Sequence, residues 1–175
     1  MIWESSHWKE PLLKSASWLR SVRLSENTQE RTFVRIEKEI FIGFYSIRKL
    51  LETVKVTDDT KSMKYELEWS PSVGKTNHLN WHNIERLYKL EQRNKENRDI
   101  GFICNLFMHS YVFMVHGESR LEGVYVTSDN LKNKKLYFVS LDNILSIYRL
   151  VGRDYPSKSE FIMNPITGEY EGKVW

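Results

Sequence analysis

Apolar side chains follow a helical period over the first third of the chain. Residues 10–23 carry them at three- and four-residue spacing, and residues 33–54 carry a wider stripe of the same period. This spacing places the apolar side chains on one face of an α-helix. The wide stripe predicts a central helix that is buried on more than one side, with Gly43 allowing a close helix contact. A polar break over 25–31 separates the two helices.

The middle of the chain mixes two periods. Residues 64–69 (KYELEW) alternate polar and apolar side chains, which predicts a strand. A helix is expected over 80–97, with its charged end exposed. Between them the sequence GKT at 74–76 is similar to the end of a phosphate-binding loop, but Trp69 stands where that motif needs a glycine. A nucleotide cofactor is therefore not expected.

In the last third of the chain, apolar side chains recur at every second residue. Two strands are predicted near 121–126 and 136–141, with a turn-rich connection between them, and Ser140 is expected to cap a helix over 141–151. Residues 160–175 are typical of a hairpin, with two short strands around Asn164–Gly168. We therefore expect a single α+β domain over 1–175, made of about four bundled helices (1–116) and a β-rich extension (117–175). That extension would contain a small antiparallel sheet and one further helix.

The composition narrows the function classes. Lys and Arg number 26 against 23 Asp and Glu, so the net charge of +3 does not by itself indicate nucleic-acid binding. Cys104 is the single cysteine, which excludes a disulfide within the chain and favours a reducing cytoplasm. The first residues lack the pattern of a signal peptide, and no apolar run is long enough to suggest a membrane span. His78, His82 and Glu85 have the spacing of metal ligands, but a helix cap at Asn80 would leave His78 outside the helix, so no metal is expected.

The most apolar run, Asp99–Gly117, is interrupted by Asn105 and His109. These two are four residues apart and would share one face of a helix. If they are buried, each needs a partner, because an unpaired buried polar group costs roughly 1–3 kcal/mol. Arg98 and Phe102 would continue the same stripe. Arg98 would lie about 16 Å from His109 along one helix, so the two could share a phosphate only if Arg98 came from a second chain.

The sequence CNLFMH at 104–109 resembles a degenerate form of the signature of the HEPN superfamily. These proteins are all-α bundles, many of them metal-independent ribonucleases of toxin–antitoxin and anti-phage systems. The signature is an Arg, often followed by Asn, and a His a few residues later. Asn105 and His109 match it, whereas Cys104 stands in place of the Arg. The resemblance implies that the His moves a proton while the Arg neutralises the phosphate, and a thiol cannot supply that charge.

Three functions follow from these patterns. The resemblance and the missing Arg favour a catalytically inactive HEPN-like binding or interaction module, in a prokaryotic defence or toxin–antitoxin context, with a homodimer, a protein partner or RNA as its target. The second is a metal-independent ribonuclease that uses His109, Asn105 and Arg98 in trans. The third is an unrelated α+β domain in which Asn105 and His109 are satisfied core residues.

Overall fold

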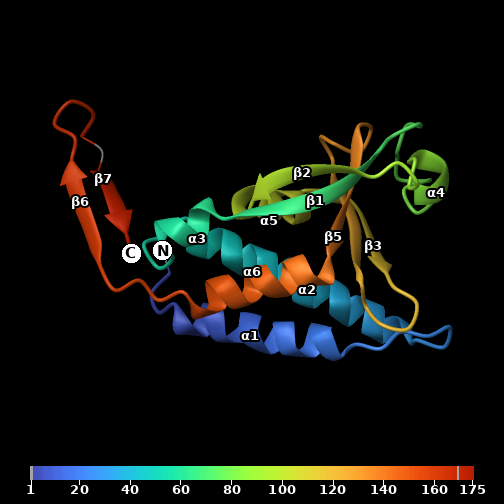
Figure 1. Cartoon of the computed structure of the whole chain (residues 1–175), viewed down its shortest axis with the longest axis horizontal. Helices are drawn as coiled ribbons and strands as arrows, with labels where there is room; N and C mark the ends of the chain where they lie inside the picture. The colour runs from blue at the N-terminus through green and yellow to red at the C-terminus, as the bar shows by residue number, and fades with distance from the viewer. Residues whose placement is uncertain (1, 169) are drawn as a thin grey trace.

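The structure is a computed structural model that describes residues 2–168 and 170–175. Within these residues the chain forms six helices, a five-stranded sheet and a separate two-stranded sheet (Figure 1). The helices are α1 (Ser6–Ser21), α2 (Glu30–Leu51), α3 (Asp58–Ser62), α4 (Ile84–Leu87), α5 (Ile100–Met108) and α6 (Leu141–Arg153). The strands are β1 (Lys64–Pro71), β2 (Asn94–Asp99), β3 (Ser110–His116), β4 (Gly123–Ser128), β5 (Lys135–Ser140), β6 (Ser159–Met163) and β7 (Tyr170–Val174). The α+β class is confirmed.

The larger sheet has the strand order β2-β1-β5-β4-β3, and every neighbouring pair is antiparallel. One face packs on α5 and α6. Helix α2 packs on α5, and α1 packs on α2 and α6, so the main core lies among these helices and the sheet. Three of the five strands precede residue 117, so the expected boundary at 117 does not separate helices from strands. The helical part is a layer on a sheet, because β1 pairs with β5 and β2 pairs with the other edge of β1. None of the described helices is both long enough and apolar enough to cross a membrane.

Helices α1 and α2 confirm the first two predicted elements, with two corrections. Pro11 lies inside α1, because that helix begins at Ser6. The stripe on α2 is buried on one side only, and Ile42 keeps 62% of its surface exposed. Gly43 allows the close contact that was predicted: the Tyr148 hydroxyl of α6 occupies the space of a Cβ atom there and donates to the carbonyls of Glu39 and Ile40 at 2.9 and 3.0 Å.

The prediction of a helix over 80–97 is wrong. Only the short α4 forms there, and the charged end is the edge strand β2, paired along its length with β1. An edge strand needs no apolar pattern, and its charges keep it from pairing with other chains. The segment before it covers the second face of the sheet, where Ile84, Leu87 and Tyr88 form a smaller core with strand residues.

The apolar run also divides differently from the single helix that was expected. It contains α5 and then β3, whose sequence SYVFMVH is rich in β-branched and aromatic residues. The later elements agree with the prediction. Strands β4 and β5 form, Ser140 caps α6 by accepting from the Asn143 amide at 3.2 Å, and the chain ends in the hairpin β6–β7.

Candidate functional site

Helix α5 presents Asn105 and His109 to solvent. The Asp99 carboxylate caps the helix by accepting from the Phe102 amide at 2.7 Å. Asn105 and His109 are both exposed, and neither side chain hydrogen-bonds to another described residue. His109 ends the helix, with its amide donating to the Asn105 carbonyl at 3.1 Å. The hypothesis that both are satisfied core residues is therefore wrong, because water reaches them.

Cys104 lies on the opposite side of α5, fully buried in the core. Burial raises the pKa of its thiol to about 12, so the thiol stays protonated and is a poor nucleophile at neutral pH. The position that matches the signature Arg thus faces the core, while its neighbour Asn105 faces solvent. An arginine at this position would not reach a phosphate bound beside His109.

Arg98 belongs to β2 rather than to the helix. Its Nε donates to Glu96 at 2.8 Å, and its guanidinium lies 4.4 Å above the Phe102 ring. His109 follows Phe102 by seven residues, or about 10 Å of helix rise. The structure therefore does not bring Arg98 and His109 of one chain together on one phosphate, and Arg98 is already engaged by a carboxylate.

Glu96 is the centre of an ionic cluster that connects β2 with β5. It accepts hydrogen bonds from Arg98, from Lys135 at 2.7 Å and from the Tyr137 hydroxyl. Burial raises the pKa of Glu96, but the three donors outweigh it and lower that pKa to about 2. Lys135 also lies 4.1 Å above the Trp69 ring. One carboxylate thus binds two cations and a hydroxyl from two strands, so the cluster is suited to holding β2 and β5 in place.

The sequence prediction missed this cluster. Lys135 and Tyr137 lie 39 and 41 residues from Glu96 along the chain, and no local pattern connects them. The charged tail predicted for a helix contained Glu96, and only strand pairing reveals its partners.

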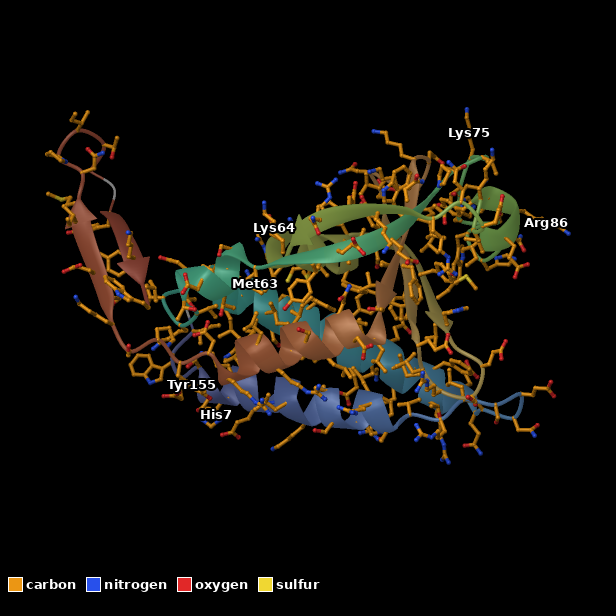
Figure 2. The ribbon with its side chains drawn as sticks, in the orientation of Figure 1. His7, Met63, Lys64, Lys75, Arg86 and Tyr155 are labelled. Atoms are coloured by element: carbon orange, nitrogen blue, oxygen red, sulfur yellow. The ribbon has the colours of Figure 1, made fainter. Side chains whose placement is uncertain are left out.

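The other motif candidates are structural. Thr76 of the GKT sequence is buried; its hydroxyl lies 3.0 Å from that of Tyr88, and its amide donates to Asn133 Oδ1 at 2.8 Å. No helix follows it, so it holds a loop in place. His78 and His82 lie outside any helix, and the described residues hold no cluster of three metal-ligating side chains. Figure 2 shows Arg86 extending from α4 into solvent.

The hairpin β6–β7 stands apart from the rest of the molecule (Figure 1). Its register pairs Met163 with Tyr170 and Phe161 with Gly172, so Phe161, Met163 and Tyr170 share one face. A side chain at Gly172 would collide with the Phe161 ring. These three apolar residues are 44–68% exposed, and Ile166 at the tip is 93% exposed. The hairpin thus presents an apolar face and tip that nothing in the described chain covers.

The base of the hairpin is fixed to the body. The amide of Val174 donates to Asp58 Oδ2 at 2.9 Å, and Val174 is buried. Lys9 of α1 is also buried, and its ammonium donates to the carbonyls of Lys55 and Asp154 and lies 4.3 Å from the Tyr155 ring. Burial lowers the pKa of Lys9, and the nearby Asp154 opposes this effect. Figure 2 places Tyr155 beside the start of α1, where the hairpin leaves the body.

A groove of about 450 Å³ lies between α1 and α2. Its apolar lining includes Leu12, Val34 and Ile42, and basic residues stand at its rim. Arg35 is already paired with Glu39 at 3.4 Å and lies over the Trp18 ring. The rest of the rim and lining consists of Pro11, Ser15, Arg31, Lys38, Gly43 and Ser46.

Comparison of the chain with models of protein families, with curated proteins and with solved structures gives no match.

Proposed function

We propose that this chain is a protein-interaction module whose C-terminal hairpin is the binding element. The observation that carries the proposal is the uncovered apolar face of the hairpin, formed by Phe161, Met163 and Tyr170. An isolated two-stranded hairpin is only marginally stable in water, and it gains stability when an apolar face is covered. Covering each of these side chains completely would contribute roughly 1–2 kcal/mol.

The placement of the other apolar residues supports this proposal. Apolar side chains scattered singly over a surface are ordinary, whereas apolar residues gathered on one projecting element mark an interaction site. Five exposed apolar residues of the hairpin lie within ten positions of sequence, and one of them, Ile162, is on the opposite face of β6 from Phe161 and Met163. The outer edges of β6 and β7 pair with no other described strand, and a partner can extend the sheet by adding a strand there.

The resemblance of residues 104–109 to the HEPN signature is compatible with this module and stays a proposal. A HEPN-like protein that lacks the Arg would act by binding rather than by cleavage. The buried Cys104 and the engagement of Arg98 by Glu96 favour that alternative over the ribonuclease.

A photo-activated cross-linker tests the interaction module. It is incorporated in place of Ile166 at the hairpin tip and, as a matched control, in place of Leu79, which is 75% exposed in the segment between β1 and α4. Figure 1 shows α4 at the opposite end of the molecule from the hairpin. Irradiation of producing cells should give a discrete protein adduct from position 166 and none from position 79. Equal labelling at both positions, or no adduct at 166, would refute the module.

A further inference from the structure

We infer that a pocket between the end of α1 and the first turns of α2 binds a small organic phosphate. The pocket has a volume of about 470 Å³, which is typical of sites that enclose a small ligand. Figure 1 shows this end of the two helices far from the hairpin. The site is therefore an activity beyond the proposed interaction module and does not depend on it.

The pocket is strongly positive. Arg23, Arg31 and Arg35 line it, and no acidic residue among those that the structure describes does so. Arg23 and Arg31 are exposed and form no ion pair with a described residue. Arg35 is engaged through its Nε, which donates to Glu39 at 3.4 Å, and its two Nη groups are left for a ligand. The pocket thus holds two positive charges without a counter-ion and a third that is shared.

The three arginines are held by fixed elements. Arg31 and Arg35 are one turn apart on α2, and the Arg35 guanidinium lies 4.0 Å from the centre of the Trp18 ring. The backbone of Arg23 forms an antiparallel bridge with that of Arg120. Like charges four residues apart on a helix repel each other, and a bound anion removes that repulsion. Side chains placed in advance lose little entropy when they bind it.

The number of unpaired charges selects a phosphate ester over a carboxylate. A phosphomonoester carries about −1.5 to −2 charges at neutral pH and offers three strong acceptor oxygens. It can neutralise both unpaired arginines, whereas one carboxylate leaves a positive charge over. Guanidinium groups bind phosphate oxygens in pairs. The Thr32 hydroxyl also lines the pocket and forms no hydrogen bond with a described residue, so it is a further donor.

The neighbouring groove indicates that the ligand also has an apolar part. Arg31 and Arg35 line both this pocket and the α1–α2 groove. The groove continues from them along Leu12 and Val34. A phosphate held by the arginines therefore places its ester group beside apolar side chains. Contact with these side chains adds affinity that inorganic phosphate cannot gain.

An NMR titration of the isotope-labelled full-length protein with phenyl phosphate tests the site. The indole signal of Trp18, identified by its loss in Trp18→Phe, should shift and saturate. Arg23→Gln and Arg31→Gln should each raise the dissociation constant at least about tenfold, because each removes a charge-assisted hydrogen bond. Arg20→Gln is the matched control, since it removes the same charge from an exposed position in the last turn of α1 that does not line the pocket. At physiological salt it should change the constant by less than about twofold.

Two further probes separate the phosphate from the apolar part. Inorganic phosphate should bind at least about threefold more weakly than phenyl phosphate, and Val34→Asn should reduce that difference without weakening inorganic phosphate. Phenylacetate, which has the ring and a single negative charge, should bind at least about tenfold more weakly than phenyl phosphate.

Four results would overturn the inference. Absence of a saturable shift, or equal losses in Arg20→Gln and Arg31→Gln, would show that no specific site exists. Phenylacetate binding as tightly as phenyl phosphate would exclude selection for phosphate. Equal affinity for inorganic and phenyl phosphate would remove the apolar part. A phosphotyrosine peptide that binds more tightly than phenyl phosphate would replace the small molecule by a protein segment. None of these results bears on cross-linking from the hairpin tip, so the two proposals fail separately.

Discussion

The Glu96 cluster gives a quantitative prediction about acid stability. The pKa of Glu96 is about 2 in the folded chain and 4.5 without the fold. A carboxyl whose pKa is lower in the folded state stabilises the fold fully above its unfolded pKa. It loses that contribution as the pH falls through the folded pKa. The window for Glu96 therefore runs from about pH 4.5 down to about pH 2.

The size of the effect follows from the same two pKa values. The difference between the folded and unfolded pKa of Glu96 corresponds to roughly 3 kcal/mol, at about 1.4 kcal/mol per pKa unit. The Glu96 side chain is 20% exposed, so solvent screens part of the interaction. We expect Glu96→Gln to lower the free energy of unfolding by about 2–3 kcal/mol at pH 6.

Urea denaturation of the wild type and Glu96→Gln between pH 6 and pH 2.5 measures this. The difference in unfolding free energy should shrink as the pH falls, because the wild type loses the charge that the variant never had. Glu66→Gln is the control: Glu66 of β1 pairs with Lys95 of β2 in the same sheet, but both side chains are more than half exposed. That variant should differ from the wild type by less than about 1 kcal/mol at any pH. A Glu96→Gln curve parallel to the wild-type curve would refute the cluster's role.

Three further predictions concern the helices. Cys104→Arg should destabilise the fold by about 3–5 kcal/mol in urea denaturation, because it buries an unpaired charge, and it should confer no RNA cleavage; a stable variant that cleaves RNA would contradict the orientation of α5. Gly43→Ala should cost about 1–3 kcal/mol, because its Cβ collides with the Tyr148 hydroxyl and ring. Combining it with Tyr148→Ala, which removes both, should cost less than the two single effects together, and strict additivity in a thermal-denaturation cycle would argue against the collision. His109→Ala should change stability by less than about 0.5 kcal/mol, because the side chain is exposed. RNA cleavage in EDTA that the wild type shows and this variant lacks would establish the ribonuclease that we do not expect.

Local sequence patterns predicted the elements in which buried side chains recur at one regular spacing along the chain. Helices α1, α2 and α6 carry regular apolar stripes, and Ser140 caps α6 as its sequence position indicates. The hairpin β6–β7 was predicted from its turn residues. In each of these cases the information lies within about ten to twenty neighbouring residues, which is the range that helix and turn preferences span.

Elements that depend on distant partners were not predictable in this way. Strand β2 does not alternate apolar and polar residues. Its Glu96 forms an ion pair with Lys135 of β5, and its outer edge is exposed to water. The boundary between α5 and β3 is hidden, since both are apolar. The exposure of Asn105 was missed for a related reason: α5 is covered on one side only, and the sequence does not show which side the sheet covers.

In the candidate site, too, local features could be predicted and features that depend on distant residues could not. The hairpin itself could be predicted, but its uncovered face could not, because exposure depends on what the remainder of the fold leaves open. The groove was hidden by the wide apolar stripe of α2, which predicted a helix buried on more than one side. Phe33 and Tyr45 of that stripe are exposed, and so is Ile42 beside it.

The anchoring of the hairpin through Lys9 determines how the arm is offered to a partner. A flexible tail would lose much conformational entropy when it is captured, and affinity would fall accordingly. Here the ammonium of Lys9 joins α1 to the carbonyls of Lys55 and Asp154, and Val174 is held by Asp58. The direction of the arm is thus set before any encounter, so association orders few additional residues. The same attachment couples α1 to binding. A shift of that helix would change the orientation of a binding surface formed more than 150 residues later in the chain.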